Sequence, residues 1–253
     1  MNRSRVQQGN TGRLRDFGLK VLASHGSLSA EEEQSARASL ADMQAAEDDA
    51  ELMAEGAPLN QAQILLEGWA VRQRVLSDGR RQIFSFLVPG DIFGLCARPH
   101  GEASCAIVAL SPATVAPLPL LNDALNTPGT AGRIVQDVLA LEESLLINQV
   151  VRLGRQSAYE RLIGLLLEFH DRLAVMDMVE DGSFILPFTQ EVLSDALGLS
   201  TVHTNRTLQQ LRREHLIETH LTHVRLMDLK MLAGISDYRM PSSLSRRAAS
   251  TAK

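Results

Sequence analysis

Four side chains in the last quarter of the chain have the types and spacing needed to read the edges of DNA bases. Val202, Asn205, Arg206 and Gln209 fall on one face of a helix that is expected to begin after Ser200. Arginine can bridge guanine O6 and N7, asparagine and glutamine can pair with adenine, and a small apolar group can touch a thymine methyl. The pattern therefore predicts a surface that recognises base pairs in the major groove.

Two short helices and a tight corner must position this surface. Thr189 is expected to cap the first helix, Gly198 to end it in the left-handed conformation, and Ser200 to cap the second. The side chains expected to pack the pair together are Val192, Leu193, Ala196, Leu197, Thr204, Leu208 and Leu211. An ordinary corner between two helices, unrelated to nucleic acid, has the same local pattern.

The residues that follow favour the DNA-binding interpretation. Residues 216–219 and 223–227 alternate like two strands around a polar turn, as in a wing. With the block LSDALGLSTVHTNRTLQQLRREHLIE, they resemble the winged helix of the Crp/Fnr family of bacterial transcription regulators. The resemblance implies double-stranded DNA and RNA polymerase as partners. The residues expected to contact DNA are Ser200, Thr201, Val202, His203, Asn205, Arg206, Gln209 and Arg225.

The middle of the chain changes to a period of two, which is typical of strands. Residues 63–76 are expected to form two strands broken at Glu67 and Gly68, and the turn at 77–80 predicts a hairpin. Residues 82–88, 106–110 and 114–118 are the further expected strands. Short antiparallel strands of this kind indicate a roll, and the run LLEGWAVRQRVLSDGRRQIFSFLVPGD resembles the sensory β-roll of the same family. An α+β fold is expected: a helical N-terminus and cyclic-nucleotide-binding-like roll (1–128), a dimerisation helix (129–156), a winged helix (157–239) and a disordered tail (240–253).

The roll lacks one group that a cyclic nucleotide would need. Family members that bind cyclic AMP hold its ribose with an acidic residue and its phosphate with an arginine followed by serine or threonine. Glu102 and Ser104 align with this cassette, but Ala103 stands where the arginine would be. Cyclic AMP is therefore not an expected effector, although Gly90, Asp91, Glu102 and Ser104 remain the candidate lining of an effector pocket.

The two cysteines, Cys96 and Cys105, are expected to be buried thiols. An iron–sulfur cluster is not expected because no cysteine precedes Cys96. Haem ligation by Cys96 with His100 and a redox switch between the two cysteines are open alternatives. A zinc site built from His203, His215, His220 and His223 is not expected, because no cysteine or carboxylate spacing supports it, and no other metal site is predicted.

A long helix is expected between the roll and the winged helix. Ile134, Val138, Leu141 and Leu145 recur at spacings of four and three residues, and Asn148 continues the stripe. Leu139, Leu146, Val150 and Leu153 form a neighbouring stripe that is expected to pack on the chain's own roll. The first stripe is therefore the predicted interface of a homodimer, and in the resembling family this helix pairs two subunits.

Composition is consistent with a DNA-binding protein that has two domains. The chain has 253 residues, 45% of them hydrophobic, and a net charge of −5, yet nine basic residues and only four acidic residues follow position 199. No apolar run suits a membrane span or a signal core, so a cytoplasmic location is expected. The sequence contains no nucleophile elbow, phosphate loop or metal triad, and an enzyme is not predicted. A ligand- or redox-sensing protein that controls a protein partner without binding DNA is the alternative.

Overall fold

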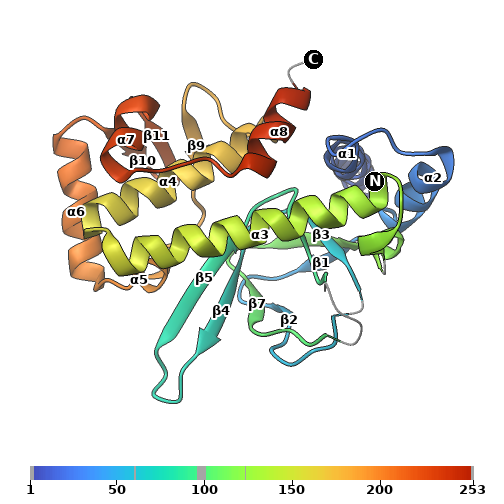
Figure 1. The fold of residues 1–253 in the computed structure, drawn as a ribbon, viewed down its shortest axis with the longest axis horizontal. Coiled ribbons are helices and arrows are strands. Elements are labelled where there is room, and N and C mark those ends of the chain that lie inside the picture. Colours follow the sequence, from blue (N-terminus) through green and yellow to red (C-terminus); the bar gives the residue numbers. More distant parts are fainter. Residues whose placement is uncertain (1–2, 60, 96–100, 123, 252–253) are drawn as a thin grey trace. The chain divides into compact units, whose positions relative to one another are not determined.

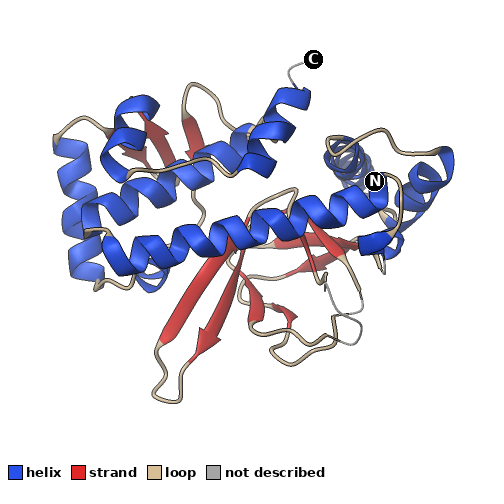
Figure 2. Ribbon diagram, in the orientation of Figure 1, coloured by secondary structure: helices blue, strands red, loops and turns tan. Residues whose placement is uncertain are grey.

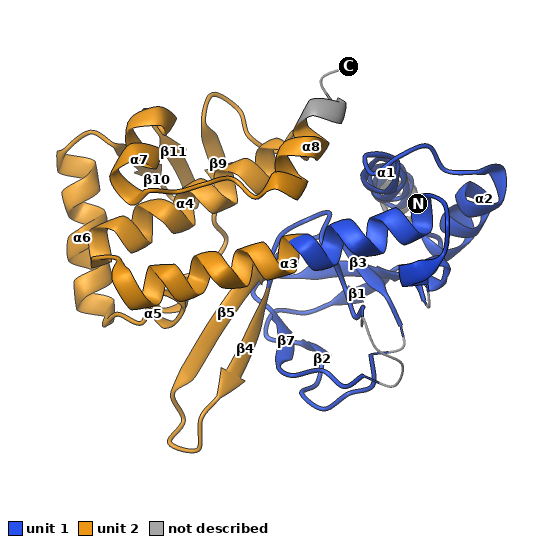
Figure 3. Ribbon diagram, in the orientation of Figure 1, with its two compact units in different colours: residues 1–70, 87–140, 250–253 blue, residues 71–86, 141–249 orange. Residues whose placement is uncertain are grey.

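The computed structural model describes residues 3–59, 61–95, 101–122 and 124–251. The chain divides into two compact units (Figure 3). The first contains residues 1–70, 87–140 and 250–253, and the second contains 71–86 and 141–249. This division runs through the long helix α3 (Thr130–Arg155) and so differs from the domain limits expected from sequence. Cys96 and His100 lie outside the described residues.

The first unit begins with two helices and continues as a roll of short strands (Figure 1). Helix α1 spans Arg3–Ala23, and helix α2 spans Ala30–Ser39. The strands are β1 (Gln44–Ala46), β2 (Glu51–Met53), β3 (Gln63–Glu67), β4 (Ala70–Val75), β5 (Arg81–Leu87), β6 (Ile92–Phe93), β7 (Ala106–Ala109) and β8 (Ala113–Pro117). Short 3-10 turns follow at Pro119–Leu121 and Ala124–Asn126. Residues 71–86, which make up most of β4 and β5, belong to the second unit.

The strands form two four-stranded sheets in the orders β1-β8-β3-β6 and β2-β7-β4-β5. Alternate side chains of the roll, among them Leu65, Phe93, Ile107 and Val115, form a buried apolar cluster. Gly68 is required at the turn between β3 and β4, because φ is +86° and an added Cβ would lie 2.5 Å from the carbonyl oxygen of Pro112. The expected roll is therefore confirmed.

The second unit combines helices with a three-stranded sheet (Figure 2). Its elements after α3 are α4 (Ala158–Ala174), β9 (Ser183–Ile185), α5 (Gln190–Leu197), α6 (Thr201–Arg213), β10 (Ile217–His220), β11 (His223–Leu226), α7 (Leu229–Ser236) and α8 (Ser242–Thr251). The strand order is β10-β11-β9. Helix α4 begins with a capping box, in which Ser157 and Glu160 each bond the other's backbone N–H. The α+β class with a winged helix at the C-terminal end is confirmed.

The expectation of a disordered tail after residue 239 is wrong. Residues 242–251 form helix α8, and Leu244 is only 1% exposed. Leu244 packs with Leu141, Leu145 and Val175 in one buried cluster. The apolar side chain of Leu244 gives this segment a buried contact that its serine- and arginine-rich composition does not suggest.

Candidate nucleic-acid interface

Helices α5 and α6 form the helix-turn-helix that the sequence predicts. Gly198 ends α5 in the left-handed conformation, with φ 63° and ψ 37°. The hydroxyl of Ser200 caps α6 by accepting a hydrogen bond of 3.2 Å from the N–H of His203. Thr204 is fully buried at the crossing of the two helices, where its hydroxyl lies 2.9 Å from that of Ser194. These contacts fix the orientation of α6 relative to α5.

The outer face of α6 is exposed. Val202 has 60% of its surface exposed, and Arg206 and Gln209 are exposed beside it. Asn205 is half-buried, since its side-chain amide donates a hydrogen bond of 2.8 Å to the side-chain oxygen of Gln190. Ser200, Thr201 and His203 are exposed at the start of the helix. The α6 side chains that are expected to contact DNA therefore lie at the start of the helix and along its accessible face. Gln190 contacts Asn205 on this face, a neighbour that the sequence did not suggest.

The wing follows α6 as strands β10 and β11. Their antiparallel register pairs Ile217 with Leu226 on the buried side and Glu218 with Arg225 on the outer side. The Nε of Arg225 donates to the carbonyl oxygen of Asp181 at 3.0 Å, and its Nη1 lies 3.7 Å from Glu218. Arg225 is thus presented on the wing with its guanidinium oriented by two acceptors.

The C-terminal end of α6 is tied to the start of α4. The hydroxyl of Tyr159 donates a hydrogen bond to the carboxylate of Glu214, which also accepts from Gln210 at 2.9 Å. Burial, followed by the hydrogen bond and the charge of Glu214, raises the pKa of Tyr159 to about 12. The hydrogen bonds from Tyr159 and Gln210 lower the pKa of Glu214. Both shifts favour the neutral phenol and the ionised carboxylate.

The backbone at the candidate effector residues of the roll is hydrogen-bonded within the roll's own turns. The carboxylate of Asp91 accepts a hydrogen bond of 2.6 Å from the N–H of Val88, and the N–H of Gly90 donates to Leu65 at 2.7 Å. Ala103 uses both backbone groups: its N–H donates to Ala57, and its carbonyl accepts from Gly56, each at 2.8 Å. The backbone N–H of Ala103 is therefore unavailable to a phosphate, and Glu102 and Ser104 are exposed.

The expected dimer stripe on α3 requires a correction. Ile134, Val138, Leu141 and Leu145 are only 0–8% exposed within the single chain, and Asn148 is half-buried. The cause is tertiary packing: Val175, at the end of α4, and α8 cover Leu141 and Leu145. The large exposed apolar side chains of α3 lie on another side of the helix. They are Leu146, Ile147, Val150 and Val151, which are 47–70% exposed.

Metal sites and membrane spans can be described for residues 3–59, 61–95, 101–122 and 124–251. Within those residues, no group of three or more His, Cys, Asp or Glu side chains is placed to hold a metal ion. Cys105 is half-buried. Among the described helices, none combines the length and apolar character that a membrane crossing requires.

A β-roll followed by a long helix and a winged helix-turn-helix defines a DNA-binding regulator with a sensor-like domain. Comparison with known proteins agrees with this class. Residues 43–121 match the cyclic nucleotide-binding domain, and residues 160–235 match the Crp-like helix-turn-helix domain. The chain belongs to the Crp/Fnr family of transcription regulators.

Individual relatives support this assignment. The transcriptional activatory protein AadR of Rhodopseudomonas palustris is 35% identical over 169 residues, which cover 66% of this chain and 69% of AadR. The nitrogen fixation regulation protein FixK of Bradyrhizobium diazoefficiens is 33% identical over 151 residues, or 59% of this chain and 62% of that protein. The structure of FixK2 from Bradyrhizobium japonicum matches with a TM-score of 0.67 and 25% identity, covering 78% of this chain and 98% of FixK2.

Proposed function

We propose that this regulator binds a two-fold symmetric DNA operator as a homodimer, with one α6 in the major groove of each half-site. The observation that carries the proposal is the exposed face of α6, on which Val202, Arg206 and Gln209 project past a buried helix crossing. Ser200, Thr201 and His203 at the start of α6, and Arg225 on the wing, are proposed to contact phosphates. These contacts would place the reading face without specifying sequence.

The homodimer is proposed to form through the exposed side of α3. Ile147, Val150 and Gly154 are exposed and follow one another at spacings of three and four residues, and Leu146 and Val151 flank them. Such spacing is typical of a seam between two parallel helices. Exposed apolar side chains concentrated on two turns of a helix favour a second copy of the same chain as their partner.

Regulation is proposed to proceed without cyclic AMP. Ala103 supplies no positive charge, and its backbone N–H is already bonded, so the cyclic phosphate would lose its hydration without compensation. We further propose that the protein acts in the cytoplasm, that RNA polymerase is the protein partner of the DNA-bound dimer, and that the protein has no enzymatic activity.

Selection of binding sites from a random duplex pool, followed by sedimentation of the selected complex, tests this function. The expected result is an inverted repeat bound by two chains, with affinity that falls steeply as salt rises. A folded protein that enriches no sequence, while it captures a small ligand or a protein partner, would contradict the proposal and favour a sensor that does not use DNA.

A further inference from the structure

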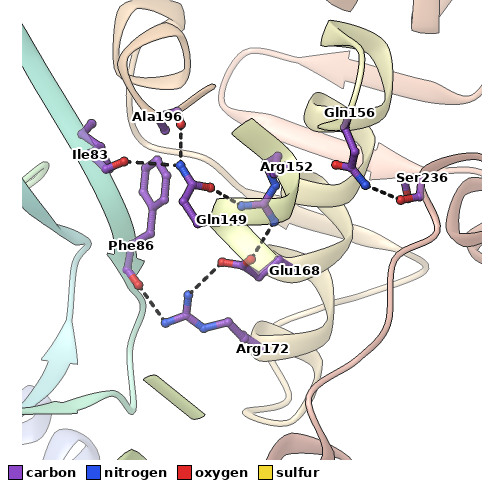
Figure 4. Close-up of polar contacts among 9 residues, drawn as sticks. All are labelled: Ile83, Phe86, Gln149, Arg152, Gln156, Glu168, Arg172, Ala196 and Ser236. Atoms are coloured by element: carbon purple, nitrogen blue, oxygen red, sulfur yellow. Dashed lines mark hydrogen bonds and ion pairs between the residues drawn. The ribbon is translucent and has the colours of Figure 1, made fainter. Parts of the chain in front are cut away.

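A buried group of charged side chains joins the end of α3 to α4 (Figure 4). Arg152 on α3 donates to the carboxylate of Glu168 on α4 at 2.8 Å, and Nη1 of Arg172 lies 3.6 Å from the other oxygen of Glu168. All three side chains are at most 4% exposed. Two buried guanidinium groups therefore share one carboxylate, which makes the position of each depend on the others.

The same group reaches the first helix of the helix-turn-helix. The amide nitrogen of Gln149 on α3 donates to the carbonyl oxygen of Ala196 at 2.6 Å and to that of Ile83 at 3.4 Å, and its oxygen accepts from Arg152. Ala196 lies in the last turn of α5, where carbonyl oxygens lack a partner within the helix. Arg172 adds a hydrogen bond of 2.8 Å to the carbonyl oxygen of Phe86. We call Gln149, Arg152, Glu168 and Arg172 the polar joint.

Burial of this kind gives geometric precision rather than large net stability. The desolvation of buried ions offsets most of their attraction, whereas removal of one partner leaves a buried charge or carbonyl uncompensated. The hydrogen bonds from Gln149 to Ala196 and from Arg152 to Glu168 depend on the present arrangement of α3, α4 and α5. A rotation of the helix-turn-helix about the end of α3 would break the bonds of Gln149 and Arg152 together.

The joint and the exposed stripe occupy the same turns of α3. Gln149 and Arg152 point into the second unit, while Val150 and Val151, beside them in sequence, are exposed. We propose that the polar joint fixes each helix-turn-helix to its dimerisation helix and thereby determines which half-site spacing the dimer accepts. This inference rests on the proposed homodimer. Gln149 and Arg152 are positioning residues in this account, since neither touches DNA.

A spacing change is a sensitive probe of such a joint. One inserted base pair moves a half-site by about 3.4 Å along the axis and rotates it by about 35°, because a turn of about 34–36 Å holds 10–10.5 base pairs. A rigid joint cannot follow this rotation, so the DNA must be untwisted instead, at a cost that appears in affinity. A loosened joint lets the helix-turn-helix follow the half-site.

The test uses the full-length protein and its selected inverted repeat, with the spacer changed by one or two base pairs in each direction. Gln149→Leu removes the bonds to Ala196 and Ile83 at similar volume. Arg152→Lys keeps the charge but loses the bridge between Gln149 and Glu168. Leu232→Ala is the matched control, since Leu232 is buried in α7 and is not part of the joint. It should lower the melting temperature and removes none of the hydrogen bonds of the joint.

The wild-type protein and Leu232→Ala should lose about tenfold or more in affinity when the spacer changes by one base pair. For Gln149→Leu and Arg152→Lys, both still dimeric, the loss should shrink to about threefold or less. If both joint variants keep the wild-type spacing profile, or if Leu232→Ala flattens the profile equally, the inference is overturned. A wild-type protein that selects no inverted repeat would instead contradict the proposed function itself.

Discussion

The side chain of Asn205 on α6 donates a hydrogen bond of 2.8 Å to the side-chain oxygen of Gln190 at the start of α5. This contact holds one edge of the Asn205 amide and leaves its oxygen and its second amide hydrogen for another partner. An asparagine held in this way is already oriented for the paired contacts that recognise adenine. Gln190 is therefore expected to support reading without contacting the base.

A double-mutant cycle on these two residues tests that expectation. Gln190→Leu should weaken binding to the selected operator by less than Asn205→Ala, and the double variant should bind like Asn205→Ala alone, with a coupling of about 0.5–3 kcal/mol. Binding measured by fluorescence anisotropy gives the four affinities. If the losses of binding free energy in the two single variants add up to the loss in the double variant, Gln190 does not act through Asn205.

The exposed stripe of α3 predicts a variant that separates dimerisation from folding. Val150→Glu should give a monomer with a melting temperature near that of the wild type, because Val150 is 70% exposed in the single chain and a dimer would bring two carboxylates together. Sedimentation velocity measures the mass. Leu141→Glu is the contrasting variant and should unfold the second unit, because Leu141 is only 8% exposed. A Val150→Glu protein that remains dimeric would rule out this interface.

Cyclic AMP at millimolar concentration should change neither the melting temperature nor the DNA affinity. A ligand that does not bind the native state cannot shift its unfolding equilibrium or its affinity for another ligand. Scanning calorimetry and titration calorimetry provide the two readings. Saturable micromolar binding would show that the roll holds the nucleotide without an arginine at position 103.

The contact between Tyr159 and Glu214 predicts a pH-dependent stability difference. Because the pKa of Glu214 is lowered in the folded state, Glu214 stabilises the fold at pH values above 4.5, its ordinary pKa. This contribution is lost as the pH falls through the folded-state pKa. The raised pKa of Tyr159 contributes stability at pH values below 10.0, its ordinary pKa. This stability is lost as the pH rises through about 12. Tyr159→Phe should therefore be less stable than the wild type between these limits.

Urea unfolding at a series of pH values measures this difference. The difference in the free energy of unfolding between Tyr159→Phe and the wild type should be constant near neutral pH. It should disappear in acid, once Glu214 is protonated. A gap of the same size at every pH would mean that the phenol acts through packing alone. Glu214→Gln is the matched control, and its own stability should not show the acid step that the wild type owes to Glu214.

The local elements were predictable from sequence, because their determinants lie within a few residues. Gly198 and Ser200 mark the corner of the helix-turn-helix through backbone conformation and capping, which depend on neighbours in the chain. The turn at Gly68 and the alternation of the strands likewise define the roll. The class of the protein and the exposed face of α6 follow from these features.

Long-range packing accounts for what the sequence did not reveal. Helix α3 carries apolar residues on more than one side, and Leu141 becomes core only because Val175 and Leu244 cover it. Spacing alone cannot show which stripe receives that cover. The hydrogen bond from Gln149 to the carbonyl oxygen of Ala196 links positions 47 residues apart. Its acceptor is a backbone group, which leaves no signal in the pattern of side chains.

If α6 reads base pairs, the loss of Arg206 should change the sequence preference of the protein. Arg206→Ala should cost about 1–3 kcal/mol and relax the preference at one base pair per half-site, at symmetry-related positions roughly 34 Å or a multiple of that distance apart. Arg225→Ala is the contrasting variant, because loss of a phosphate contact should weaken all sequences alike and lower the salt slope by about one unit. The deciding measurement is binding-site selection with wild type, Arg206→Ala and Arg225→Ala. Only Arg206→Ala should lose a base preference. Selected sites from Arg206→Ala that match the wild-type motif at every position would show that Arg206 does not read a base.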